Sequence, residues 1–247
     1  MSKEIMERDF RWLYRAGAYA ILAAALVFRR FYGVELMTFQ GFGLFSVPEV
    51  EPVSAAEWFG VLRSYPYAGL SMLGLYDMVN YVLVCVFFLA VGGALRDTGR
   101  GLVAVCIAGS LLAAAVYLST NRAFPMLLLS GRYAAAAPET RSVFLAAGEA
   151  HLAVFQSGSQ ISLFLLYLAG LGLSISMLKS EHFKRITASA GILANAIGIL
   201  YYPMLLVLDS WSWLPPALSA PFRMAWYILA AFDLLKLARR RSDTQDG

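Results

Sequence analysis

The residues best able to do chemistry in this sequence are charged and amide side chains set within long apolar runs. Asp77 and Asn80 are three positions apart, so they would share one face of a helix, and Asn121 and Arg122 close the end of a later run. A charge in hydrocarbon is costly and usually faces a partner or a water-filled space. We therefore expect Asp77 to form an ion pair with Arg122 or with Arg223.

Further amides and tyrosines are predicted at a similar depth, in the outer half of the membrane. The complete predicted ligand-binding set is Asp77, Asn80, Asn121, Arg122, Gln156, Gln160, Tyr201, Tyr202 and Arg223. Small-molecule pockets are mainly apolar, with a few fixed polar groups. The set therefore predicts an outward-facing polar pocket that takes a small amphiphile or lipid. An Asp–Arg pair that only fixes helix packing explains the charged members equally well.

Glu149 and His151 are the next candidates for chemistry, since only two histidines are present. On a helix they would point roughly 200° apart, so the two side chains cannot bind one metal ion. The sequence contains no phosphate loop, nucleophile elbow, zinc-ligand spacing or haem motif. We expect no metal, no cofactor and no catalytic residues.

Six apolar runs must position these residues. They are Leu13–Phe28, Leu70–Leu95, Leu102–Leu118, Ile161–Leu178, Ile186–Leu208 and Ala217–Leu237. About 20 apolar residues span a bilayer as a helix, which satisfies every backbone amide internally. Apolar residues make up 60% of the chain and charged residues 15%, against about a quarter charged in soluble domains. The prediction is all-α: a polytopic membrane helix bundle with six transmembrane helices, in which residues 1–247 form a single domain.

Lys and Arg are more frequent in the segments on the N-terminal side of the predicted membrane than in the opposite segments. The positive-inside rule then predicts that both termini are cytoplasmic, in the cell membrane. The sequence pI of about 9.1 reflects this orientation, so we expect membrane lipids as partners and no nucleic acid. The small-residue faces of the runs are compatible with a protein partner or a homo-oligomer.

The two long outer connections are each predicted to contain a short extra helix. In the first, Ser54 and Glu57 have the spacing of a capping box and Pro66 ends the apolar stretch that follows. In the second, Pro138 suits the first turn of a helix that continues into the fourth run. Within the fifth run, Asn195 lies on a stripe with Gly191 and Gly198, which predicts an interhelical hydrogen bond.

Several short stretches resemble a family of prokaryotic multi-pass membrane proteins that are classified only as containing a domain of unknown function. The stretches are Ser54–Trp58, Leu75–Asn80, Ser119–Leu127, Leu129–Ser130, Tyr133–Ala136, Leu145–Glu149 and Met177–Ser180. The resemblance covers most of the chain, and it implies a six-helix protein of the bacterial or archaeal cytoplasmic membrane. It implies no substrate, cofactor or catalytic residue.

Three functions remain open. The favoured one is a non-enzymatic protein that binds or transports a small amphiphile or lipid at the outer pocket. The second is an accessory or scaffold subunit of a membrane complex. The third and least favoured is an enzyme acting on a lipid-linked substrate, with Asp77 or Glu149 as acid–base and Arg122 holding an anionic group.

Overall fold

The computed structural model describes the backbone of residues 3–27 and 52–243, and the side chains of these residues apart from 3–9, 26–27, 209 and 240–243. Helices form throughout these two ranges, which contain no strand. The all-α prediction is therefore confirmed. The end of the first apolar run, at Phe28, and most of the first outer connection lie outside the described residues.

Five stretches of the described chain are long and apolar enough to cross a membrane. They are Leu75–Ala94, Arg100–Ala135, Pro138–Met177, Arg185–Val207 and Leu214–Arg239. Each overlaps one of the last five predicted runs. The first predicted run lies in helix α1 (Lys3–Val27), which is not among the five because polar residues such as Arg11 and Arg15 lower its hydropathy.

The chain divides into two compact units. Unit 1 comprises Met1–Phe28, Asn80–Ala114 and Leu163–Gly247, and unit 2 comprises Arg29–Val79 and Ala115–Ser162. Three helices contribute to both units: α5 (Leu75–Ala94), α6 (Arg100–Thr120) and α8 (Arg141–Met177).

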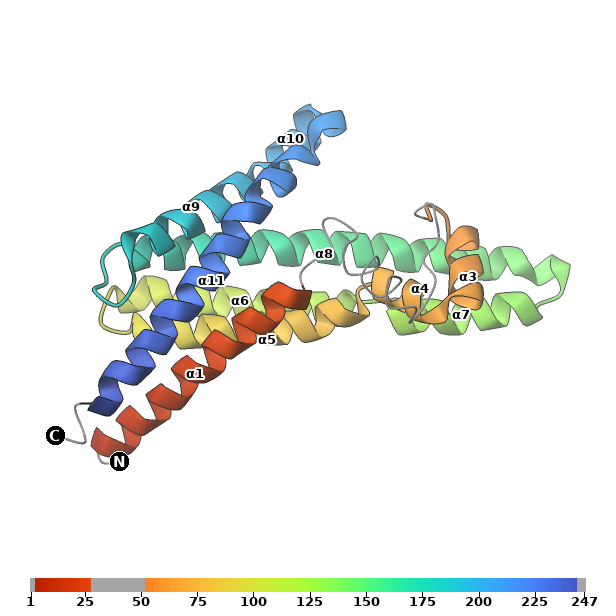
Figure 1. The fold of residues 1–247 in the computed structure, drawn as a ribbon. Coiled ribbons are helices and arrows are strands. Elements are labelled where there is room, and N and C mark those ends of the chain that lie inside the picture. Colours follow the sequence, from red (N-terminus) through yellow and green to blue (C-terminus); the bar gives the residue numbers. More distant parts are fainter. Residues whose placement is uncertain (1–2, 28–51, 244–247) are drawn as a thin grey trace. The chain divides into compact units, whose positions relative to one another are not determined.

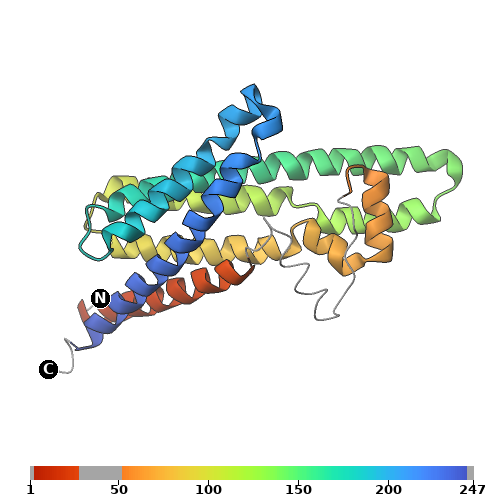
Figure 2. The ribbon, with the colours of Figure 1, turned by 45° about the horizontal axis from the view of Figure 1, so that its top comes forward.

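Unit 1 is completed by α1 and by three further helices: α9 (Arg185–Ile199), α10 (Tyr201–Val207) and α11 (Leu214–Asp243). A short 3₁₀ helix, Asp209–Trp211, precedes α11. Helix α11 packs against both α1 and α9 (Figures 1 and 2). The start of α1, the α5–α6 connection, the α8–α9 connection and the end of α11 all lie at the same end of this unit.

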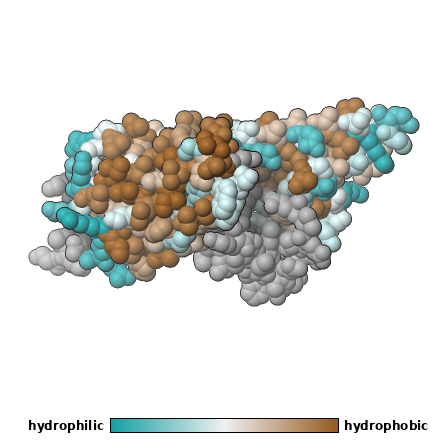
Figure 3. Space-filling view, turned by 90° about the horizontal axis from the view of Figure 1, so that it is seen from above, coloured by the Kyte–Doolittle hydropathy of each residue, from teal (hydrophilic) through white to brown (hydrophobic). Residues whose placement is uncertain are grey.

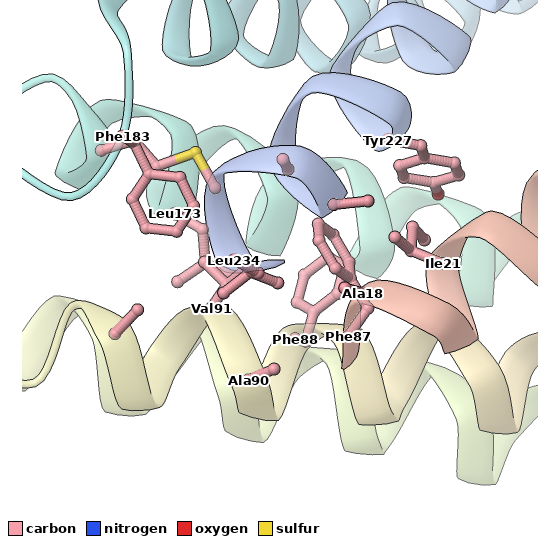
Figure 4. Close-up of a cluster of buried hydrophobic side chains, with 14 of the residues drawn as sticks. Ala18, Ile21, Phe87, Phe88, Ala90, Val91, Leu173, Phe183, Tyr227 and Leu234 are labelled. Atoms are coloured by element: carbon pink, nitrogen blue, oxygen red, sulfur yellow. The ribbon is translucent and has the colours of Figure 1, made fainter. Parts of the chain in front are cut away.

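The core of unit 1 is built from aromatic side chains of α5 that meet small and aromatic side chains of α1 and α11. Phe87 and Phe88 point toward Ala18 of α1 and toward α11 (Figure 4). The Phe87 ring packs edge-on against Trp226, with 5.5 Å between ring centroids, a favourable arrangement for aromatic quadrupoles. Gly17 of α1 lies so close to Ala90 that a larger side chain would clash.

The surface of unit 1 separates apolar from polar side chains. Apolar side chains cover most of the face seen in Figure 3, and polar ones gather at the end that holds the α8–α9 connection. This distribution fits helices that face lipid along their length and water at that end.

Unit 2 contains α3 (Ala55–Ser64), α4 (Pro66–Met72) and α7 (Ala123–Ala135), together with a 3₁₀ turn, Pro138–Thr140. Helix α3 packs against α4 and α7. The predicted capping box is confirmed: the Ser54 hydroxyl accepts from the Glu57 amide, and the Glu57 carboxylate accepts from the Ser54 amide.

Three elements differ from the sequence prediction. The second run is two helices, because the chain turns at Leu73 and at Gly74, whose φ is 81°. The fifth run is interrupted at Leu200, which separates α9 from α10. Helix α7 was not predicted. Its Pro125 lies in the first turn, where a proline does not interrupt a helix. Helix α8 runs unbroken into the fourth run, as predicted.

Candidate functional site

Arg223 is a buried charged side chain within a stretch of unit 1 that is long and apolar enough to cross a membrane. It lies in α11 and is only 7% exposed. Its Nη2 donates to the Tyr167 hydroxyl at 2.6 Å and to Ser219 Oγ at 3.1 Å, and its guanidinium carbon lies 4.6 Å from the centre of the Tyr167 ring. Ser219 is one helical turn earlier and Tyr167 comes from α8, so both partners hold the guanidinium in a fixed orientation.

A small cavity of about 30 Å³ adjoins this guanidinium. It is formed by four helices of unit 1, α5, α8, α9 and α11. Its lining residues are Asn80, Tyr81, Val84, Phe88, Leu163, Leu166, Tyr167, Asn195, Arg223, Trp226 and Tyr227. A water molecule needs about 10–15 Å³ of such space, so the cavity fits two or three waters or one carboxylate group.

Besides Arg223, two side chains lining the cavity have polar atoms without a hydrogen-bond partner among the described residues. These atoms are Oδ1 of Asn80, which is 2% exposed, and Nε1 of Trp226, which is 1% exposed. Leaving a buried polar group unpaired costs about 1–3 kcal/mol. The indole N–H can only donate, whereas an amide can present either its donor or its acceptor end. The donors at the cavity itself are therefore those of the Arg223 guanidinium, which suit an occupant that accepts hydrogen bonds.

Tyrosines gather around Arg223. The Tyr202 hydroxyl on α10 lies within electrostatic range of Arg223 and of Tyr81, Tyr167 and Tyr201. The Tyr202 ring centroid is 5.1 Å from that of Tyr201. Four members of the predicted ligand-binding set, Asn80, Tyr201, Tyr202 and Arg223, thus belong to one region of unit 1.

Asp77 and Asn121 both lie in unit 2, beside the break between α4 and α5, and their hydrogen bonds stabilise it. The Tyr117 hydroxyl donates to Asp77 Oδ2 at 3.1 Å. Asn121 Nδ2 donates to the carbonyls of Leu73 and Gly74 at 3.1 and 3.3 Å, and Asn121 Oδ1 accepts from the Ala123 amide at 3.0 Å. These bonds satisfy backbone groups that the α4–α5 and α6–α7 breaks would otherwise leave unpaired.

Among the described residues, no ion pair joins Asp77 to Arg122, the first of its two predicted partners. Arg122 Nη1 donates to the carbonyls of Ser119 and Asn121 at 2.9 and 3.2 Å. These carbonyls lie at the end of α6, where a cation interacts favourably with the unpaired oxygens of the helix. The alternative pairing, of Asp77 with Arg223, joins residues of different units and stays a prediction.

The remaining predicted residues lie on the part of α8 that belongs to unit 2. Gln156 and Gln160 are both exposed. Glu149 Oε1 accepts from the Ala55 amide at 2.7 Å, so this carboxylate caps the start of α3. Among the described residues, no three His, Cys, Asp or Glu side chains come together as metal ligands.

Sequence reasoning missed Tyr167 and Trp226 as members of the cavity. Trp226 is three residues after Arg223 on α11, which placed it on the same helix face, but nothing in the sequence ties Tyr167 to that face. Asn195 also lines the cavity, and the interhelical bond predicted for it is wrong: its Nδ2 donates to Gly191 O of its own helix at 2.7 Å.

Comparison of the chain with models of protein families, with curated proteins and with solved structures found no match. The resemblance described above therefore stays a prediction. The proposed function therefore rests on the geometry of the site alone.

Proposed function

We propose that this chain is a membrane protein that binds an amphiphile with a small anionic head group, and that the head group occupies the cavity beside Arg223. The apolar part of the amphiphile would lie along the lipid-facing surface of the helices. The observation that carries the proposal is a buried guanidinium at a small cavity, whose lining also includes Asn80 and Trp226, two side chains with a polar atom that has no partner among the described residues.

The size of the cavity selects the head group. About 30 Å³ corresponds to two or three waters, so the cavity suits a small group such as a carboxylate. Arg223 presents donors at the cavity, Trp226 carries a further donor in its lining, and a guanidinium matches the planar geometry of a carboxylate. An ionised group inside hydrocarbon needs such a partner, because its desolvation is otherwise too costly.

The proposed membrane arrangement has six spans, with α1 added to the five apolar stretches. Helix α1 packs into the core of unit 1, where the Tyr14 hydroxyl donates to the Gly93 carbonyl of α5 at 3.2 Å. The cationic residues Arg96, Lys179, Lys184 and Arg239 belong to segments at the end of unit 1 that holds the start of α1 and the end of α11. This supports a cytoplasmic position for that end, in the cell membrane of a prokaryote.

The test is ligand-induced stabilisation of the purified chain in detergent. Dodecanoate, dodecanol and dodecyltrimethylammonium present an anionic, a neutral and a cationic head group on the same alkyl chain. We expect dodecanoate alone to raise the unfolding temperature. Trp226→Phe keeps the ring but removes the donor, so it should weaken dodecanoate binding about tenfold, the effect of one lost hydrogen bond to a charged group. Arg223→Gln should abolish binding.

Trp213→Phe is the matched control, because Trp213 is exposed and does not line the cavity. It should bind dodecanoate as the natural chain does. Equal stabilisation by dodecanol, or an equal loss of binding in Trp213→Phe, would show that the alkyl chain alone is recognised and would overturn the proposal.

A further inference from the structure

A second and larger pocket, of about 290 Å³, lies in unit 1 between the α8–α9 connection and the last turns of α11. Lys184 and Lys236 line it from opposite elements, over a floor made by Phe183 and Leu237. Both floor residues are buried and both lysines are exposed. The pocket thus combines an apolar floor with cations at its rim.

The pocket lies beside the ends of three stretches that are long and apolar enough to cross a membrane. The α8 stretch ends at Met177, the α9 stretch begins at Arg185, and the α11 stretch ends at Arg239. The lining residues fall between or beside these ends. Lipid phosphates occupy the layer just outside the hydrocarbon.

Neither lysine ammonium has an ion-pair partner within 4.0 Å among the described residues. The buried acidic group of the pocket, Asp233, is 6% exposed and holds the start of α9. Its Oδ2 accepts from the Lys184 amide at 3.2 Å and from Thr187 Oγ1 at 2.7 Å. The carboxylate therefore caps the start of α9 and fixes the backbone of Lys184 at the pocket wall.

We propose that this pocket binds the phosphate group of a membrane phospholipid, with Lys184 and Lys236 as its cationic partners. Two carboxylates, of Glu181 and Asp233, also line the pocket. They disfavour a doubly charged phosphate monoester, so the single charge of a phosphodiester fits best. The site is separate from the Arg223 cavity, because the two pockets share no lining residue.

The experiment is native mass spectrometry of the full chain, delipidated in detergent and titrated with phosphatidylglycerol, diacylglycerol or inorganic phosphate. We expect one tightly retained phosphatidylglycerol per chain and no retained diacylglycerol. The double variant Lys184→Gln/Lys236→Gln should bind phosphatidylglycerol about thirtyfold more weakly, the effect of two cations at a membrane surface. A cooperative unfolding transition like that of the natural chain verifies its folding.

Lys179→Gln/Arg239→Gln is the matched control, since it removes the same charge at exposed positions outside the pocket. It should retain phosphatidylglycerol. Equal weakening in this control would show attraction by the general surface charge and overturn the site. Displacement of the lipid by millimolar inorganic phosphate would identify a free-phosphate site, which would overturn the assignment to a phospholipid.

Discussion

Asn80 places a carboxamide in the interior of α5, and its Oδ1 has no hydrogen-bond partner among the described residues. Leucine has a similar volume and no polar group. We therefore expect Asn80→Leu to raise the free energy of unfolding by about 1 kcal/mol, because an unpaired buried polar group is removed. The same variant should lose dodecanoate binding. Reversible unfolding in mixed micelles, with and without dodecanoate, measures both effects.

Asn121→Leu is the natural contrast to that variant. The Asn121 amide pairs with three backbone groups, so the same substitution there should lower the free energy of unfolding by about 2 kcal/mol. If Asn80→Leu is destabilising to a similar extent, the Asn80 amide has a hydrogen-bond partner in the membrane, such as a structural water. The Asn80 amide would then not be available to bind a ligand.

At this scale the sequence predicted which residues are polar and buried but not which residues they contact. Asn80 and Arg223 do line one cavity. The partners of Asp77 and Arg122 could not be predicted, because a tyrosine hydroxyl and the carbonyls of a helix end serve as well as opposite charges. The spacing of apolar residues does not indicate which hydrogen bonds the polar side chains form. It reports only which face of a helix is turned inward.

Among the elements, α3 is unusual in that its first turn is capped by two different parts of the chain. The Ser54–Glu57 box is local, and Glu149 of α8 adds a bond to the Ala55 amide. A charge-assisted cap of this kind contributes about 1–2 kcal/mol. Glu149→Ala should therefore make the α3 amides exchange with deuterium about tenfold faster.

Glu139→Ala serves as the control for that measurement, because Glu139 is exposed in the turn before α8. It should leave the α3 amides unchanged. Unchanged exchange in Glu149→Ala as well would mean that the local capping box alone holds α3, and that Glu149 is available for another role.

Local signals predicted the elements well where caps or prolines mark them, and poorly inside apolar runs. The capping box and Pro66 gave the bounds of α3 correctly. The breaks at Gly74 and Leu200 were missed, because residues on both sides of each break are apolar. A run of hydrophobic residues indicates burial in lipid or protein, but it does not say whether the backbone stays helical.

For the whole molecule, the length of α8 constrains the arrangement in the membrane. Its 37 residues extend for about 55 Å at 1.5 Å per residue, whereas the hydrocarbon core is about 30 Å thick. If α8 crosses the membrane, part of it must therefore project beyond the hydrocarbon. The N-terminal part carries Glu149, His151, Gln156 and Gln160, and the C-terminal part is apolar up to Met177, so the projecting part is the N-terminal one.

This leads to a prediction about orientation that a labelling experiment can test. The turn containing Glu139 and the connection containing His182 flank α8, and both side chains are exposed. If α8 crosses the membrane, the two positions lie on opposite sides. With Cys85 and Cys106 replaced by alanine, Glu139→Cys should react with an impermeant maleimide on the outer face of intact cells. His182→Cys should react only after permeabilisation, because the cationic end of unit 1 faces the cytoplasm.

Each other pattern of labelling has a definite meaning. Exclusive labelling of position 182 would invert the orientation, so that the lysine pocket would face the outer leaflet and the rule of inside positive charge would fail for this chain. Labelling of both positions in intact cells would mean that α8 does not cross the membrane. Its apolar C-terminal half would then need protein rather than lipid to cover it, which favours an accessory subunit over a lipid-binding protein.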